Sequence, residues 1–179
     1  MAATFSWSED NGTQTGSPLK GTTRTTSRTE RNYKNIDDST TAYSSSTITA
    51  GNNSYSKYQF GVFSGTYNQI LNGKWSAHTS PAGALATGLT LKGTVTSTYA
   101  TPATTANAAL TTDFTTAVAV ASGLTVNFAA SGPENASPAS TLSSGGGYTQ
   151  YLVSQLQTSS SAAAGDIASI TETLQYDEN

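Results

Sequence analysis

Hydrophobic and polar residues alternate along much of the chain after residue 47, and this period of two predicts β-strands. The alternation is clearest over residues 58–63, 89–96 and 170–176, and a strand-like composition returns over residues 148–157. Amphipathic helices of useful length are not predicted. Short strands at this spacing favour an all-β fold, an antiparallel β-sandwich of jelly-roll or related type.

Turn residues divide this predicted sandwich further. Asn72-Gly73 lies between apolar runs, and it fits the type I′ turn of a β-hairpin, whose two central residues need positive φ. A second hairpin is predicted over residues 114–128. Residues 130–147 contain two prolines and a run of glycines, so we expect a long surface loop there.

Residues 1–47 carry few hydrophobic residues and show no period, so the sequence predicts an extended N-terminal arm followed by a sandwich domain at residues 48–179. Val, Ile, Leu and Phe together make 27 of the 179 residues, about 15% of the chain. A fraction below roughly 20% makes disorder an alternative, because little apolar surface can be buried. The net charge is only −3, so the chain lacks the self-repulsion of a disordered protein. We therefore expect it to gain burial by packing on other molecules.

The predicted arm holds most of the positive charge. Residues 1–92 contain all 8 Lys and Arg and 5 acids, a balance of 8 − 5 = +3, whereas residues 93–179 contain 6 acids and no base. Copies of the chain or unlike partners could meet through these opposite charges, or the charges could simply be solvated. The basic residues expected to dock on a partner are Lys20, Arg24, Arg28, Arg31 and Lys34.

Nucleic acid is the sharper interpretation of this basic cluster, and three features argue against it. Glu30, Asp37 and Asp38 dilute the positive charge, Tyr33 is the only aromatic residue in the cluster, and the isoelectric point is about 4.9. The cluster is therefore assigned to protein contacts.

Candidate chemistry is sparse. The chain has no cysteine, which excludes disulfides and thiolate metal sites, and His78 is its only histidine. The pairs Glu9-Asp10, Asp37-Asp38 and Asp177-Glu178 are neighbours in sequence, so on an extended chain their carboxylates point opposite ways and are expected to be solvated. No phosphate-binding motif or long apolar segment is present, and residues 1–10 show no cationic region followed by an apolar stretch, the pattern of a signal peptide. We expect a protein made in a cytosol without catalytic residues, metal, cofactor or membrane contact.

Aromatic side chains offer one candidate binding surface. Nine tyrosines and two tryptophans stand against a small aliphatic inventory, and rings with a polar group favour both sugar stacking and subunit interfaces. The residues expected on this surface are Tyr55, Tyr58, Tyr67 and Trp75. Exposed rings would indicate a carbohydrate-binding or host-attachment module, and covered rings an interface.

Three stretches carry a resemblance to a known class. They are residues 48–54 (ITAGNNS), residues 58–61 (YQFG) and the ending at residues 170–179 (ITETLQYDEN). The chain resembles small virion structural proteins of tailed bacteriophages, which often end in a β-strand and a short acidic tail. The resemblance implies a capsid decoration protein or a neck, tail or baseplate component. It also implies a location in the virion after assembly in the host cytoplasm, contacts with major capsid or tail proteins and with copies of itself, and no cofactor.

Overall fold

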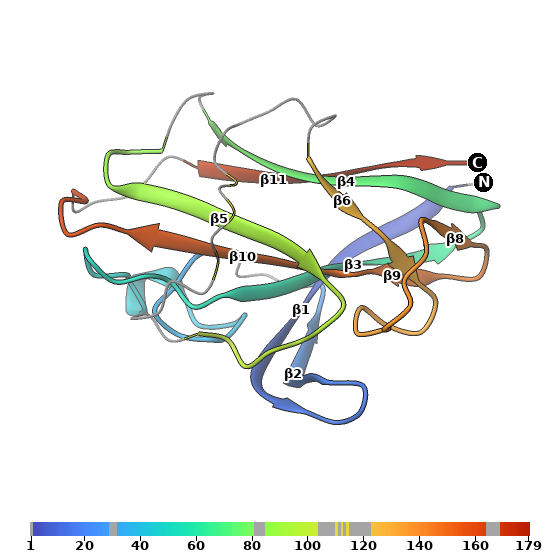
Figure 1. Ribbon diagram of the computed structural model, residues 1–179, viewed down its shortest axis with the longest axis horizontal. Coiled ribbons are helices and arrows are strands. Elements are labelled where there is room, and N and C mark those ends of the chain that lie inside the picture. The colour runs from blue at the N-terminus through green and yellow to red at the C-terminus, as the bar shows by residue number, and fades with distance from the viewer. Residues whose placement is uncertain are drawn as a thin grey trace.

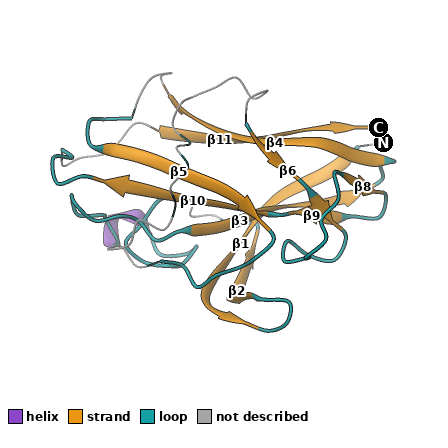
Figure 2. Cartoon of the chain, viewed as in Figure 1, coloured by secondary structure: helices purple, strands orange, loops and turns teal. Residues whose placement is uncertain are grey.

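The computed structural model describes residues 2–28, 32–80, 85–103, 110, 112, 114, 123–163 and 169–179, and these residues are almost wholly strand and loop (Figure 2). Among them the one helix is a short 3-10 turn, η1 (Tyr43–Ser45). The strands are β1 (Ala3–Thr15), β2 (Lys20–Thr26), β3 (Lys57–Gly65), β4 (Gln69–Ser80), β5 (Leu89–Thr96), β6 (Leu124–Val126), β7 (Phe128–Ala129), β8 (Thr141–Ser143), β9 (Gly147–Thr149), β10 (Tyr151–Thr158) and β11 (Ser169–Glu178).

The strands form two sheets that pack face to face (Figure 1). The larger sheet has seven strands in the order β2-β1-β3-β10-β5, with β9 paired to β3 and β7 paired to β9. The smaller sheet has four strands in the order β11-β4-β6, with β8 paired to β4. All of these pairings are antiparallel. The all-β antiparallel sandwich predicted from the sequence is confirmed.

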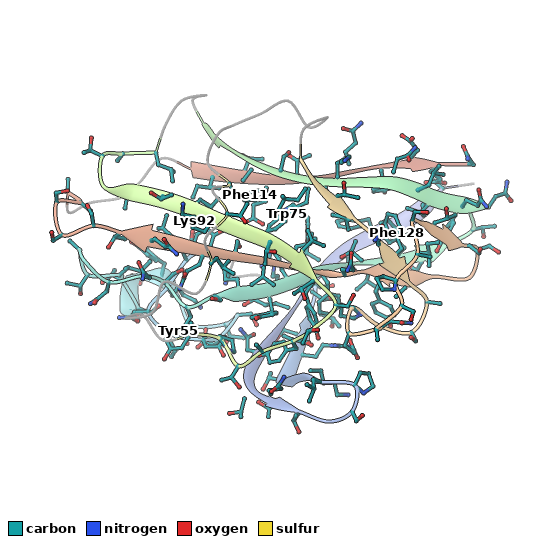
Figure 3. All side chains as sticks on the ribbon, in the orientation of Figure 1. Tyr55, Trp75, Lys92, Phe114 and Phe128 are labelled. Atoms are coloured by element: carbon teal, nitrogen blue, oxygen red, sulfur yellow. The ribbon has the colours of Figure 1, made fainter. Side chains whose placement is uncertain are left out.

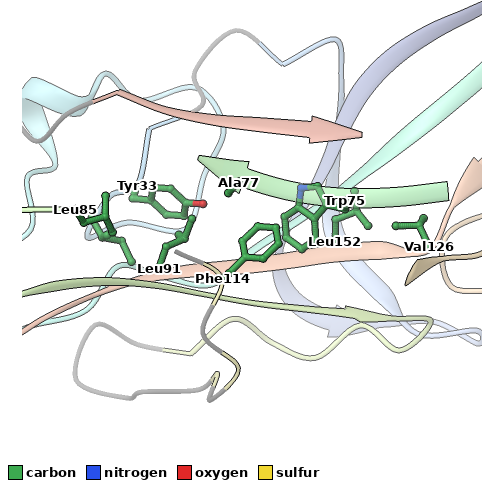
Figure 4. Packing of buried hydrophobic residues seen from close by; sticks show 9 residues of the cluster. Tyr33, Trp75, Ala77, Leu85, Leu91, Phe114, Val126 and Leu152 are labelled. Carbon is green, nitrogen blue, oxygen red and sulfur yellow. The ribbon is translucent and has the colours of Figure 1, made fainter. Parts of the chain in front are cut away.

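The main core lies between the two sheets and is centred on Trp75 of β4. Trp75 is fully buried, and its ring centroid lies 4.3 Å from that of Phe114. Aliphatic side chains from both sheets surround this pair (Figure 4). The other buried members are Tyr33, Ala77, Leu85, Leu91, Val126, Leu152 and Leu156.

The outer face of the larger sheet is also covered, by a second and mainly aromatic cluster. Its buried members are Tyr58, Phe60, Tyr99, Tyr151 and Val153. Tyr99 comes from the loop after β5, and its ring centroid lies 4.6 Å from that of Tyr58. Because this loop closes over the sheet, both faces of β3 and β10 are dry.

The predicted N-terminal arm is wrong, because its first half belongs to the larger sheet. β1 pairs with β3 from Ala3 to Asp10 and with β2 from Ser8 to Thr15. The boundary at residue 47 therefore does not separate an arm from a domain. Hydrophobic periodicity missed β1 because its buried positions include Glu9 and Asp10, whose charges are matched by distant residues rather than kept in water.

The predicted hairpin at Asn72-Gly73 is also wrong, since β4 runs straight through both residues. Asn72 has the positive φ of 55° that the pattern required. That conformation produces a β-bulge instead of a turn: the register to β11 shifts between Gln175 and Asp177. A Cβ at Gly73 would lie 2.6 Å from the carbonyl oxygen of Val126, so the glycine permits close approach of β6.

Four of the other predicted strands are present, whereas the predicted loop and the second hairpin are not as expected or not fully described. Strands over residues 58–63, 89–96, 148–157 and 170–176 are confirmed by β3, β5, β9 with β10, and β11. The predicted loop at 130–147 contains a strand, β8, which pairs with β4. Of the hairpin predicted over 114–128, residues 115–122 lie outside the described residues. Phe114 itself donates a backbone hydrogen bond to the Leu91 carbonyl at 2.8 Å, so this residue lies beside β5.

Candidate functional site

Glu9 lies at the centre of a buried charged cluster on the inner face of the larger sheet. Glu9 is 0% exposed. Glu9 Oε2 pairs with Arg28 Nη1 at 2.8 Å, while Oε1 lies 3.3 Å from Lys57 Nζ and 2.9 Å from Asn11 Nδ2. Strand pairing positions these groups, because β1 and β3 are antiparallel neighbours. One carboxylate therefore holds two cations and one amide.

The cluster continues across the sandwich to the smaller sheet. Arg28 donates from Nη2 to Gln59 Oε1, and Gln59 donates from Nε2 to Glu172 Oε2 on β11. The Tyr33 hydroxyl donates to Glu172 Oε1 at a distance of 2.6 Å, and the same hydroxyl oxygen lies 2.9 Å from Ser154 Oγ. The chain of polar contacts from Glu9 to Glu172 thus links the two sheets through their interior.

Opposite formal charges are paired along this chain of contacts. Glu9 and Glu172 contribute two negative charges, and Arg28 and Lys57 contribute two positive charges, so these four groups sum to 2 − 2 = 0. The Asp37 carboxyl group, which accepts from Asn11, lies beside them. Removing such groups from water is costly, and only complete pairing offsets the loss. The network therefore tolerates the loss of any single member poorly.

Burial shifts the proton affinity of two neighbours of Glu9. Desolvation lowers the pKa of the Lys57 amine; the Glu9 carboxylate opposes this shift, and the positive charge of Arg28 adds to it. Desolvation also raises the pKa of Asp37, against the hydrogen bonds that its carboxyl accepts from Asn11 and Gly12. The neutral forms of the Lys57 amine and the Asp37 carboxyl group are thus easier to reach here than in water.

Asp10, the next residue along β1, points to the opposite face and forms a separate cluster. It is fully buried, and Arg24 contacts it through two bonds, Nε to Oδ1 at 2.7 Å and Nη2 to Oδ2 at 2.8 Å. Tyr151 donates its hydroxyl to Oδ2 at 2.5 Å, and Arg24 also pairs with Glu134 at 3.0 Å. The bidentate bond to Asp10 raises the pKa of Arg24, despite desolvation. This cluster joins β1, β2 and β10 to the loop around Glu134.

The opposite orientation of neighbouring carboxylates was predicted for Glu9-Asp10 and is confirmed. The expectation that both are solvated is wrong, because each is buried against its own arginine. The decisive residues Asn11, Lys57 and Glu172 were not singled out from the sequence. Their contacts with Glu9 and Gln59 depend on strand register, which no local pattern specifies.

The basic residues expected to form a partner-binding arm do not share one surface. Arg24 and Arg28 are held in the ion pairs described above. Lys34 is buried and pairs with Asp38 at 2.6 Å. Lys20 is exposed at the start of β2, and Arg31 lies outside the described residues. Ion pairs within the chain hold three of the five charges, which contradicts the prediction that these five residues form one basic docking face.

The aromatic surface predicted from Tyr55, Tyr58, Tyr67 and Trp75 is wrong as well. Tyr58, Tyr67 and Trp75 are 9%, 4% and 0% exposed, and only Tyr55 is partly accessible. Figure 3 places Trp75 between the sheets and Tyr55 at the periphery. The rings bury against the chain's own strands, because its few aliphatic residues leave aromatic side chains to fill the interior.

The Lys34–Asp38 pair should make stability depend on acid pH. Desolvation alone would raise the pKa of Asp38, but hydrogen bonds from Lys34 and from Thr40 and Thr41 outweigh it and hold that pKa well below its usual 3.8. A lowered carboxyl pKa adds stability above the usual value, and this stability is lost as pH falls below it. We expect urea unfolding between about pH 5 and pH 2 to show this loss, and Asp38→Asn to flatten the profile while lowering stability at pH 6. An unchanged profile in the variant would contradict this assignment.

Comparisons with known proteins return no relative. No family model matches the chain, and neither a curated protein nor a solved structure is significantly similar to it. Within the described residues, no three His, Cys, Asp or Glu side chains are grouped so as to hold a metal ion. The same residues include no helix that is both long and apolar enough to cross a bilayer.

Proposed function

We propose that the protein is a structural subunit of a tailed bacteriophage virion, acting as a capsid decoration protein rather than as an enzyme. Its partners are then major capsid proteins and copies of itself, and its place is the assembled particle. Two things support the proposal: the resemblance of residues 48–54, 58–61 and 170–179 to small virion proteins, and the places that the fold gives to charged and apolar side chains.

The β1–β2 hairpin is the observation that carries this proposal. Its turn end projects beyond the other strands of the larger sheet (Figure 1), and Leu19 at this turn is 42% exposed. The base is fixed: Gln14 donates from its backbone nitrogen to Thr101 Oγ1 at 2.9 Å, and Tyr99 donates its hydroxyl to the Gly12 carbonyl at 2.7 Å. A rigid projection with an apolar tip suits a contact with a neighbouring subunit, because little conformational entropy is lost on docking.

The buried charges also favour a structural role. Glu9 and Asp10 are each bonded to arginines that come from other segments, so their carboxylates serve to join strands. A carboxylate that acts on a separate substrate molecule needs access to it, and both of these side chains are at most 1% exposed. The carbohydrate-binding alternative is not carried forward, because Tyr58, Tyr67 and Trp75 are buried.

Immunogold electron microscopy tests the proposal directly. Antibodies raised against the purified chain would be applied to particles of a phage whose genome encodes it. Label on the capsid surface is the expected result. Label confined to the neck or tail would move the subunit to that location, and particles without label would reject the virion assignment.

The hairpin contact predicts a loss of incorporation for Leu19→Asp. A charge at this tip would have to be desolvated against the neighbouring subunit, so we expect occupancy in purified particles to fall at least about tenfold. Ile36→Asp is the matched control, since Ile36 is equally exposed at 42% and lies off the hairpin. Quantitative immunoblotting of purified particles measures both. Equal occupancy of the two variants would show that the hairpin is not the contact.

A further inference from the structure

Glu9, Asn11 and Lys57 bring an amine, a carboxamide and a carboxylate together in a dry site. Glu9 Oε1 accepts a hydrogen bond from Asn11 Nδ2 at 2.9 Å and another from Lys57 Nζ at 3.3 Å. The three residues are 0%, 4% and 6% exposed. A nucleophile and an electrophile therefore contact the same carboxylate oxygen, which is the arrangement that general acid-base catalysis of amide exchange requires.

Strand register places the reacting side chains opposite each other. β1 and β3 pair Glu9 with Gln59 and Asp10 with Tyr58, and their ladder ends at that pair. Continued by one position, the same register would set Asn11 across from Lys57, and both of these side chains bond to Glu9 Oε1. Directly opposite residues on antiparallel strands have Cβ atoms about 4.5–5.5 Å apart, with their side chains on one face. A bond between these two side chains needs no change in the pairing of the strands.

We propose that Lys57 and Asn11 join in an intramolecular isopeptide bond, with Glu9 as the catalytic carboxylate. Lys57 passes one Nζ proton to Glu9, and the free amine attacks Cγ of Asn11, so that an Nζ–Cγ bond forms and the carbonyl electron pair moves to Oδ1. Glu9 gives its proton to Nδ2 and takes a second one from Nζ. The Cγ–Nδ2 bond breaks, the carbonyl reforms, and ammonia leaves with the second proton as ammonium.

The surroundings favour the attack by Lys57 and hold the Asn11 amide in place. Burial lowers the pKa of the Lys57 amine, which increases its nucleophilic neutral form. Asp37 Oδ1 accepts from the same Asn11 nitrogen at 2.8 Å, so two carboxyl groups fix the orientation of the amide. Asn11 Oδ1 and Arg28 Nε, both on side chains that contact Glu9, are buried without a hydrogen-bond partner among the described residues.

The bond would give this chain a covalent brace. It has no cysteine and hence no disulfide, and the new bond would close the loop between residues 11 and 57. The β1–β2 hairpin would then be tied covalently to the centre of the larger sheet. This inference depends only on the geometry of β1 and β3, so it stands or falls independently of the proposed role in a virion.

Mass spectrometry of the purified, folded chain tests the bond. The intact mass is expected to be lower than the encoded mass by one ammonia, and a protease digest is expected to contain a branched peptide that joins Lys57 to Asn11. The encoded mass in the folded protein would overturn the proposal. So would ammonia loss without the branch, as succinimide formation at Asn11-Gly12 produces, and so would water loss with Lys57 joined to Asp37.

Variants separate the three roles. Lys57→Arg keeps the positive charge but removes the primary amine, Asn11→Ala removes the electrophile, and Glu9→Gln removes the carboxylate, so each is expected to abolish the branched peptide. Lys74→Arg is the matched control and should retain it, because Lys74 bonds to Thr125 on the other sheet. A branched peptide in Lys57→Arg, in which Asn11 is joined to another amine, would refute the assignment of Lys57. Where a variant fails to fold by circular dichroism, the wild-type digest still decides.

Discussion

Replacing Glu9 with leucine is expected to lower the free energy of unfolding by about 3–5 kcal/mol, the range for removing one partner of a buried ion pair. The physical reason is that Arg28, which is only 7% exposed, stays buried without the Glu9 carboxylate that it pairs with. Without Glu9 the proposed bond to Asn11 does not form either, so Lys57 keeps a free amine that has lost its counter-charge. Urea denaturation followed by circular dichroism measures the change as a shift of midpoint at constant slope.

Two further variants show whether unpaired buried charge causes the loss of stability in Glu9→Leu. Asp177→Ala removes an exposed carboxylate that accepts a bond from Asn72 at 2.7 Å, and such surface changes usually stay within about 0.5 kcal/mol. Combining Glu9→Leu with Arg28→Met and Lys57→Met should recover part of the lost stability, because no cation is then stranded. A Glu9→Leu variant as stable as Asp177→Ala would mean that water reaches the cluster and screens it.

The strands that sequence predicted are those whose burial follows the pleat. β5 alternates Leu91 and Val95 toward the core with threonines on the other face, so a period of two is visible in the sequence. β3 is dry on both faces, since Tyr58 and Phe60 pack under the Tyr99 loop. Its aromatic composition still indicated a strand, although not that its rings would be buried by the same chain.

The candidate site was not predictable in the same way. Glu9 carries the signal of a solvated residue, because a carboxylate is almost always exposed unless it is paired. Its partners Arg28 and Lys57 come from segments that meet it only through tertiary structure, and nothing local encodes the register of β1 on β3. Asn72 shows the complementary limit. Its positive φ was inferred correctly, but the same backbone angle occurs in a turn or in a bulge, and here β4 continues past Asn72 with a bulge opposite β11.

Truncating Trp75 to alanine is expected to cost about 3–5 kcal/mol, the range for removing a large aromatic side chain from a core. Trp75 is fully buried between the sheets, and its ring stacks obliquely on Phe114 at 4.3 Å. Strands on all sides fix the cavity walls, so they can relax only partly into the space. For a chain of this length the loss corresponds to a fall in Tm on the order of 10 °C, which differential scanning calorimetry measures.

Trp75→Phe separates ring packing from the indole nitrogen. Trp75 Nε1 is buried without a hydrogen-bond partner among the described residues, and an unpaired buried donor lowers stability by about 1–3 kcal/mol. Phenylalanine keeps a ring against Phe114 and deletes that donor, so its smaller volume is partly offset and the variant should lie much closer to wild type than Trp75→Ala. If the two variants melted together, the indole nitrogen would have to be bonded, and the cavity at Trp75 would not be what limits the stability of this core.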